Sequence, residues 1–323
     1  MCSLCSLWLK WVLVFTSLVA TPASAQIQQA WVARYNNGIT NGTNQAVKMA
    51  LDSAGNIYVT GFSQNANTNL GYVTIKYAPN GNQLWAARYV STNFPTATPS
   101  AMVLDASNNV IVAGSALTVK YDFNGNQLWT APYAGTALAV DSNGNIAVTG
   151  FGSSFNTVEL SPSGSYLWQG TYPSSSGAAV GQAIAADTSG NIYVAGCWPF
   201  TFENILYYDL LAIKYSPTGT QLWEVSDQGY GYLPQVEAAV LDTSTNLYIE
   251  ANFYKGYAYN DTTSAIPYFT YKFANDGTML WIANNPTDNS LSQAQGLALD
   301  TFGDAIIAGR YAAYPRRAME PIK

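Results

Sequence analysis

Two carboxylates and an amide stand where this sequence departs from its own repeats, and they are the residues that could perform acid–base chemistry. Glu250, with Asn252 after it, ends a repeated block whose other copies have threonine or alanine in its place, and Glu237 precedes the block. Glycoside cleavage needs two carboxyl groups about 5 to 10 Å apart. A structural ion pair with Lys48, at the matching level of the first repeat, is the alternative, because buried charges must be paired or solvated.

The residue types that the sequence lacks exclude several kinds of catalytic site. The sequence has no histidine, which excludes Ser-His and Cys-His nucleophile pairs and imidazole metal ligands. An enzyme of this sequence would have to use carboxylates, tyrosine, lysine or arginine, so a carboxylate-dependent polysaccharide hydrolase or lyase is one hypothesis. We assign no catalytic residue, no metal and no cofactor from the sequence.

Aromatic side chains in long connections form the second candidate site. Residues 197–210, 225–235 and 252–268 are rich in tyrosine, tryptophan and phenylalanine, with acids between them. Such rings suit sugar rings or a protein partner, and the alternative is that they pack the connections onto each other. The predicted binding residues are Trp198, Phe200, Glu203, Tyr230, Tyr232, Glu237, Glu250, Asn252 and Tyr254.

Two further sets of charged residues recur once per repeat. The aspartates could bind calcium, but each loop brings only one, and an Asx turn, in which the side chain accepts backbone N–H groups, accounts for the pattern. The lysines are expected to be solvated, and Glu159 replaces them in the third repeat. The positions are Asp52, Asp105, Asp141, Asp187, Asp242 and Asp300, and Lys76, Lys120, Lys214 and Lys272.

All of these residues are set in a repeat of short β-rich runs. Blocks such as LDSAGNIYVTG (51–61) occur six times and blocks such as APNGNQLW (78–85) five times, with segments such as VTIKY (73–77) between them. Each unit therefore has four runs separated by Gly, Asn, Asp and Ser, and no window has a helical period. Four-stranded units at a period of about 40–50 residues predict an all-β fold, a β-propeller of four-stranded antiparallel blades.

Six blades are expected, five of them complete. After Gly309 no clear third strand follows, so AWVARY (30–35), which matches AARY at 86–89, is expected to supply the outer strand of the sixth blade. Such closure removes open sheet edges. In the turn before each Leu-Trp pair, Asn80 and Gly81 are expected to take positive φ.

The connections between the strands differ in length in a systematic way. Those from the first to the second run and from the third to the fourth are short and uniform, whereas the others vary widely. In a four-stranded meander all of the variable connections lie on one face. Because binding usually resides in variable loops on a rigid scaffold, this face is expected to bind the ligand.

The pattern D-x-x-G-N-hydrophobic-Y-V-x-G, followed by h-x-K-Y-x-x-x-G-x-x-L-W, resembles the SBBP family of bacterial β-propeller repeats over about residues 31–310. The resemblance is specific because both blocks recur in order. It implies a propeller that is exported or displayed at the bacterial cell surface, and it carries over no catalytic residue. Quinoprotein dehydrogenase repeats are similar in outline, but their eight-blade pattern with a fixed aspartate is missing here.

The first residues of the sequence predict export. Lys10, an apolar run at 11–20 and an Ala-x-Ala pattern ending at Ala25 are typical of a secretory signal peptide, here residues 1–25. A single domain, 26–323 with a tail at 311–323, is expected to be secreted to the extracellular space, the cell surface or the periplasm. Cys197 is then its single cysteine, so no internal disulfide is expected.

Composition limits the partners. The formal net charge is −6 and there is no basic cluster, which argues against nucleic acid and against membrane insertion. The leading hypothesis is a monomeric, non-enzymatic binding or scaffold module. Its partner would be an extracellular glycan or a surface protein, bound through the variable face.

Overall fold

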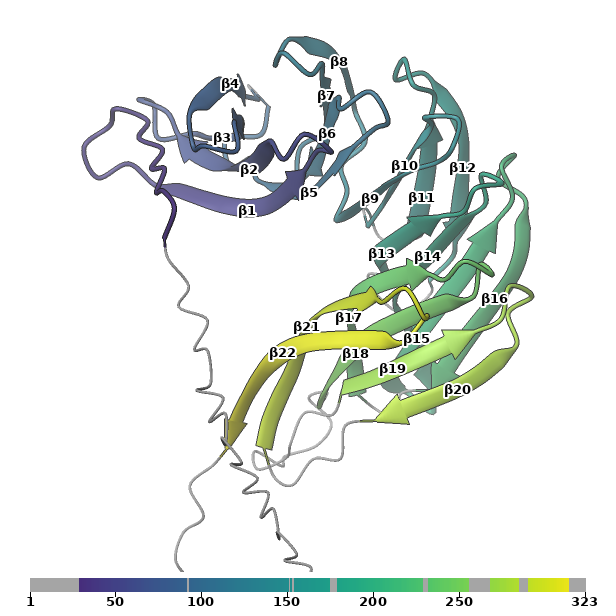
Figure 1. The fold of residues 1–323 in the computed structure, drawn as a ribbon. Coiled ribbons are helices and arrows are strands. Elements are labelled where there is room, and N and C mark those ends of the chain that lie inside the picture. The colour runs from purple at the N-terminus through teal and green to yellow at the C-terminus, as the bar shows by residue number, and fades with distance from the viewer. Residues whose placement is uncertain are drawn as a thin grey trace, which may run out of the picture. The chain divides into compact units, whose positions relative to one another are not determined.

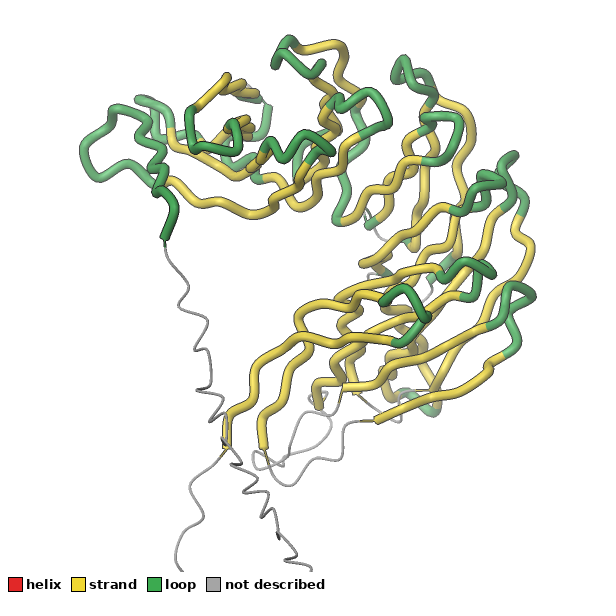
Figure 2. The backbone as a smooth tube through the Cα atoms, viewed as in Figure 1, coloured by secondary structure: helices red, strands yellow, loops and turns green. Residues whose placement is uncertain are grey.

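The computed structural model describes residues 29–91, 93–150, 152, 154–174, 179–228, 232–255, 268–284 and 290–313. The chain divides into two compact units, Met1–Val32 and Ala33–Lys323, and every strand described below belongs to the second. The described part consists of strands and loops and contains no helix (Figure 2), so none that could cross a membrane. The predicted signal peptide lies outside the described residues.

The described strands form five four-stranded antiparallel sheets and one strand pair, numbered here as sheets 1 to 6 (Figure 1). Sheets 1 and 2 contain β1 (Asn44–Leu51), β2 (Ile57–Gln64), β3 (Leu70–Tyr77), β4 (Gln83–Tyr89), β5 (Pro99–Leu104), β6 (Val110–Gly114), β7 (Thr118–Tyr121) and β8 (Gln127–Ala131). Sheets 3 and 4 contain β9 (Ala137–Val140), β10 (Ile146–Thr149), β11 (Phe155–Leu160), β12 (Tyr166–Tyr172), β13 (Val180–Ala186), β14 (Ile192–Phe202), β15 (Ile205–Tyr215) and β16 (Gln221–Gln228). Sheet 5 contains β17 (Tyr232–Leu241), β18 (Leu247–Lys255), β19 (Tyr268–Phe273) and β20 (Met279–Asn284), and sheet 6 contains β21 (Ser290–Leu299) and β22 (Ala305–Ala313).

Each sheet is a meander whose strands are hydrogen-bonded in chain order. This confirms the prediction of an all-β chain built from four-stranded antiparallel units. The turns between the first and second strands and between the third and fourth strands lie at one end of each sheet. The connections of variable length lie at the opposite end.

The first turn of each sheet is an Asx turn. Asp52 Oδ1 accepts the backbone N–H groups of Ala54 and Asn56 at 3.0 and 2.8 Å, and the Asn56 amide donates to Asp52 Oδ2 at 2.8 Å. The two backbone hydrogen bonds recur at all the other repeated aspartates: Asp105, Asp141, Asp187, Asp242 and Asp300. The prediction of a local turn function for these carboxylates is confirmed.

The second turn differs from its predicted geometry. Gly81 has a φ of 88° and donates its N–H to Ala78 O at 2.9 Å, whereas Asn80 is outside the left-handed region. A register shift between Lys76 and Tyr77 accompanies the turn. The loop is therefore of the longer kind that ends in a glycine bulge, in which one residue takes positive φ, and not a two-residue hairpin that requires two.

Consecutive sheets are fastened by this second turn. In sheet 1 the Trp85 indole N–H donates to Phe123 O, in the second turn of sheet 2, at 3.0 Å, and Lys76 Nζ lies 3.3 Å from the same oxygen. The Trp85 ring also lies against Gly125, where a Cβ would come within 2.7 Å of it. Equivalent indole bonds reach the next sheet from three further repeat tryptophans: Trp129 to Pro162 O, Trp168 to Pro217 O and Trp223 to Asn275 O. The glycine and the tryptophan that recur in the repeated block thus contact each other across neighbouring sheets: the indole of one sheet packs on and donates to the glycine-containing turn of the next.

The repeated lysines are not solvated, which corrects the sequence-based expectation. Lys120 is buried, its ammonium group lies 2.9 Å from Asp105 Oδ2, and it also donates to Pro162 O of the next sheet at 3.3 Å. Lys76 and Lys272 form the matching pairs with Asp52 and Asp242. The pattern was misread because a charged strand residue is usually exposed, whereas here the Asx turn of the same sheet supplies a buried counter-ion.

The N-terminal segment AWVARY does not form the predicted strand. Residues 30–35 are irregular, and Tyr35 packs against the sheet 1 cluster of Val73, Ile75 and Tyr77. Sheet 6 has two strands among the described residues. An outer strand forms only when an inner strand offers it hydrogen-bonding partners, and the described residues contain no third strand of sheet 6 to do so.

Candidate functional site

The long connection predicted at residues 197–210 is an extension of the sheet. β14 and β15 run on as a hairpin that ends at Phe202 and Ile205, and Glu203 and Asn204 between them have φ of 50° and 63°. Two successive residues with positive φ are the signature of a type I′ turn, which matches the twist of the flanking strands. The aromatic residues of this segment are therefore held on rigid strands.

A continuous row of aromatic rings lines one face of this hairpin. Trp198 and Phe200, two residues apart on β14, stack with ring centroids 5.7 Å apart and an angle of 11° between the planes. Phe200 stacks in turn on Tyr207, its cross-strand partner on β15, at 5.5 Å and 24°. Tyr172 of sheet 3 meets the edge of Trp198 at 5.7 Å. We call Tyr172, Trp198, Phe200 and Tyr207 the aromatic row.

The aromatic row is anchored at one end and partly exposed along its length. Trp198 donates its indole N–H to Pro173 O at 3.0 Å, and Ser174 Oγ donates to Pro199 O at 3.3 Å, which ties the hairpin to sheet 3. The rings of Trp198, Phe200 and Tyr207 remain partly exposed. The row is thus a preformed aromatic surface at the variable end of sheet 4, where two of the predicted binding residues come together.

Three acids surround the aromatic row. Tyr172 donates its hydroxyl to Glu224 Oε1 at 3.0 Å, Glu203 is exposed in the hairpin turn, and Asp209 lies opposite Trp198 in the strand register. The neighbouring Cys197 is buried, and burial, with the Asp209 charge, raises the pKa of its thiol to about 12. Cys197 is therefore not a nucleophile at neutral pH.

Glu250 is buried, contrary to the prediction that it lines a binding site. Its side chain is 0% exposed, Oε2 accepts the Thr270 hydroxyl at 2.7 Å, and Oε1 accepts no hydrogen bond within the described residues. Burial raises the pKa of Glu250 to about 7 against the effect of the Thr270 bond, and the nearby Glu237 charge adds to the rise. Sheets 1 and 3 have hydroxyl pairs at this position, Thr60 with Thr74 and Thr149 with Thr157.

Asn252 and Glu237 join sheet 5 to sheet 6. The buried Asn252 amide donates to Ala294 O at 2.9 Å and accepts the Ala294 N–H at 2.9 Å, and it also donates to Glu237 Oε1 at 3.0 Å. Glu237 is the bulge residue of β17. Gln182, the bulge residue of β13, accepts the N–H of Val236 at 2.9 Å. Asn252 and Glu237, both predicted as binding residues, therefore take part in the contact between sheets 5 and 6.

The other predicted residues do not extend the aromatic row. Tyr254 accepts a hydrogen bond from the Gln293 amide at 3.1 Å, across the contact between sheets 5 and 6. Tyr230 and the side chain of Tyr232 lie outside the described residues. Lys48 is exposed, and the structure shows no ion pair between Lys48 and Glu250 in the part that it describes. Glu250 instead meets its polar partner on the adjacent strand.

A second glutamate, Glu159, is also buried, although it was not among the predicted site residues. Glu159 is 0% exposed and occupies the lysine position of sheet 3, where its Oε2 accepts the indole N–H of Trp168. Burial raises the pKa of Glu159 to about 7, although the Trp168 bond lowers it, and the Asp141 charge raises it further. The signal in the sequence was the exchange of a lysine for an acid, which is informative only once the lysine position is known to be buried.

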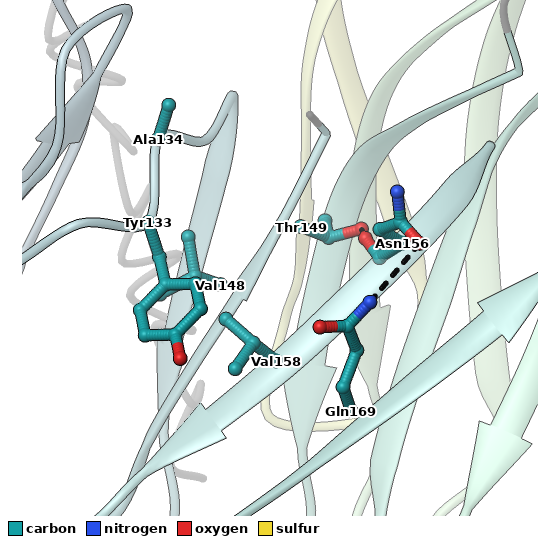
Figure 3. Close-up of a pocket in the computed structure, with 7 residues that line it drawn as sticks. All are labelled: Tyr133, Ala134, Val148, Thr149, Asn156, Val158 and Gln169. Atoms are coloured by element: carbon teal, nitrogen blue, oxygen red, sulfur yellow. Dashed lines mark hydrogen bonds between the residues drawn. The ribbon is translucent and has the colours of Figure 1, made fainter. Parts of the chain in front are cut away.

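A small cavity lies between the end of sheet 2 and one face of sheet 3. It measures about 80 Å³ and is lined by Tyr133, Ala134, Val148, Thr149, Asn156, Val158 and Gln169. Figure 3 shows Tyr133 facing Val148 and Val158, with the amides of Asn156 and Gln169 joined by a hydrogen bond. The cavity has room for a few water molecules and no charged lining residue, so it offers hydrogen-bonding groups but no acid–base pair.

The turns do not assemble a metal site. No group of three His, Cys, Asp or Glu side chains able to hold a metal ion lies together among the described residues. The Asx-turn carboxylates already accept two or more hydrogen bonds from their own turns, as at Asp242.

Comparisons with known proteins give distant similarities. No family model matches the sequence. An uncharacterized WD repeat-containing protein, L264, of Acanthamoeba polyphaga mimivirus is 27% identical over 215 residues, which are 58% of this chain and 15% of that protein. The chain thus spans well under two thirds of this relative, and the similarity assigns no family.

Several solved structures are similar at low sequence identity. A protein of unknown function from Bacteroides caccae has a TM-score of 0.47 and 14% identity, over 79% of this chain and 85% of that one. A gluconolactonase from Xanthomonas campestris has a TM-score of 0.39 and 15% identity, over 82% and 94%. An ulvan lyase of family PL25 has a TM-score of 0.47 and 10% identity, over 81% and 79%. At these values the similarities carry no argument about activity.

Proposed function

We propose that this protein is an exported six-bladed β-propeller repeat protein that binds an extracellular glycan through the aromatic row of sheet 4. Sheets 1 to 5 correspond to complete blades and β21–β22 to part of the sixth. The repeated fastening of Trp85 to the next sheet supports this interpretation, because the same indole bond recurs from each of sheets 1 to 4 to the sheet that follows it. The role is that of a binding or scaffold module.

The observation that carries the proposal is the aromatic row itself. Trp198, Phe200 and Tyr207 are spaced 5.7 and 5.5 Å apart on a rigid hairpin and are partly exposed at the variable end of the sheet. Aromatic rings supply apolar contact area at little entropic cost, and their polar neighbours can fix orientation. A row of rings on rigid strands suits a chain of sugar rings better than a single small molecule.

The alternative, a carboxylate-dependent hydrolase or lyase built on Glu250 and Glu237, has less support. A general acid must reach the bond that it protonates. Glu250 is fully buried against Thr270, and Glu237 is bound by Asn252. Glu250 is thus enclosed within sheet 5, and Glu237 is held at the contact with sheet 6 through the bond of Asn252 to Ala294.

A glycan-binding measurement with the mature chain, residues 26–323, tests the proposal. Neutral and charged polysaccharides would be screened on an array and confirmed by calorimetry, with Trp198→Ala and Phe200→Ala as test variants. Phe302, 88% exposed in the turn of sheet 6, offers the matched control Phe302→Ala. At least tenfold weaker binding for the test variants alone is expected, a loss of about 1.4 kcal/mol. Binding that survives in both test variants, with their melting temperatures unchanged, would refute the assignment to the row.

A further inference from the structure

The part of the chain that carries the aromatic row has no available positive charge. Between Lys120 and Lys214 the sequence contains no lysine or arginine, and the whole sequence contains no histidine. Lys120 and Lys214 are themselves buried and donate to main-chain oxygens of the following sheets. The same stretch contains six acids: Asp122, Asp141, Glu159, Asp187, Glu203 and Asp209.

The acids nearest the aromatic row are placed to act on a ligand. Glu224 is exposed and accepts the hydroxyl of Tyr172, the first ring of the row, at 3.0 Å. Glu203 is exposed at the far end of the row, in the hairpin turn. An acid therefore stands at each end of the row, and neither is paired with a cationic side chain among the described residues.

We infer that the aromatic row selects an uncharged glycan and excludes polysaccharides that carry uronate or sulfate groups. The inference rests on the proposed function and specifies its ligand class. An anionic sugar would lose hydration on the row without gaining a cationic partner from residues 121–213, and it would meet Glu203 and Glu224. Like charges brought together in this way cost free energy and suppress the wrong ligand.

A cationic ligand fits the geometry less well. Recognition of a quaternary ammonium group uses several ring faces that converge on one point. Trp198, Phe200 and Tyr207 instead stack on each other at 11° and 24°, so each inner ring face is covered by its neighbour. The exposed surface of the row is a strip of ring edges and outer faces, which matches an extended neutral chain.

Matched polymer pairs test the inference. Amylose, galactomannan and a β-glucan would each be compared with the same polymer after oxidation of part of its C6 hydroxyls to carboxylates, so that chain length and linkage stay constant. We expect at least one neutral polymer to bind and its oxidised form to bind at least tenfold more weakly at low salt. The discrimination should shrink in 0.5 M NaCl, because exposed charges are screened.

A charge-reversal series separates the selectivity from the binding itself. The double variant Glu203→Lys, Glu224→Lys should bind the oxidised polymer at least tenfold more tightly than the natural protein does, and Trp198→Ala should lose both forms. Asp304→Lys, an exposed acid in the turn of sheet 6, is the control for net charge. Equal or tighter binding of the oxidised polymer by the natural protein would overturn the selectivity and leave the proposed function standing. Absence of binding to all polymers, neutral and oxidised, would overturn both.

Discussion

Trp168 donates its indole N–H to the carboxylate of Glu159, at the position where sheets 1, 2, 4 and 5 have a lysine. The same N–H also lies 3.2 Å from Pro217 O of the next sheet. In sheets 1, 2 and 4 the lysine and the tryptophan both donate to the equivalent main-chain oxygen of the next sheet, as Lys120 and Trp129 do at Pro162 O. Sheet 3 thus keeps the tryptophan half of the fastening and replaces the cationic half by an acid.

This replacement predicts a pH-dependent stability. Burial raises the pKa of Glu159 to about 7 from an ordinary value of 4.5. A carboxyl whose pKa is higher in the folded than in the unfolded state favours folding while it is protonated. This contribution is complete below about pH 4.5 and is lost as the pH rises through about 7. Glu159→Gln should therefore stabilise the protein at pH 8 by about 2 kcal/mol and change it little at pH 4.5. Urea unfolding of both proteins at pH 4.5 and pH 8 measures the change in the free energy of unfolding. An equal change at the two pH values would contradict a raised pKa for Glu159.

Glu250 gives a second, independent prediction. Its pKa is also raised to about 7 by burial, and Oε2 is bound by Thr270. Glu250→Gln should keep that hydrogen bond, stabilise the protein at pH 8 by about 1–2 kcal/mol and leave glycan affinity unchanged. Loss of affinity without a change in melting temperature would restore Glu250 as a binding residue. The two glutamates lie in different sheets, so their effects should add.

The repeats made the strands predictable, because runs of β-branched and aromatic residues alternate with turn residues at fixed spacing. QLWAARY at 83–89 coincides with β4, and the Asx turn at Asp52 was correctly inferred from its Asp-x-x-Gly-Asn spacing. The inter-sheet contacts were not predictable. Nothing local to Lys76 or Asn252 indicates that its partner lies in the following sheet.

The candidate site was predicted in part for the same reason. Trp198 and Phe200 could be identified because their neighbourhood is aromatic over a short stretch, and the structure joins them to Tyr207 and Tyr172. Glu250 was singled out because it breaks the repeat. A residue that departs from the repeat can be adapted either to a neighbouring side chain or to a ligand. Its burial in the structure distinguishes these two roles, and burial is not visible in the sequence.

The buried ion pair of sheet 2 predicts a large effect from a single change. Burial raises the pKa of Asp105, but hydrogen bonds from Lys120 and Asn109 outweigh it and hold the pKa below its ordinary 3.8. The resulting stabilisation is present above that value and is lost as the pH falls below it. Lys120→Met should cost about 3–5 kcal/mol at pH 7, because it leaves a buried carboxylate without its counter-ion.

Lys48→Met is the control for the loss of one charge. Lys48 is exposed on β1, so its replacement should change stability by no more than about 0.5 kcal/mol. Urea midpoints at pH 7 and pH 3 compare the two variants. If Lys120→Met and Lys48→Met were equally stable at pH 7, the buried pair would have no energetic role.

The glycine of the repeated turn permits the most direct test of the fastening between sheets. Gly125 and Gly303 have nearly the same φ, 88° and 84°, but a Cβ on Gly125 would come within 2.7 Å of the Trp85 ring, whereas one on Gly303 would meet nothing within 4 Å. Alanine at either position costs about 1–2 kcal/mol for the left-handed conformation. Gly125→Ala should cost a further 1–3 kcal/mol or so, because Trp85 must move away from Phe123 O. Equal losses in the two variants, measured by urea unfolding, would show that the glycine serves the turn alone. An excess loss in Gly125→Ala that disappears when Trp85 is also replaced by alanine would establish that the turn of one sheet is the docking point for the tryptophan of the sheet before it.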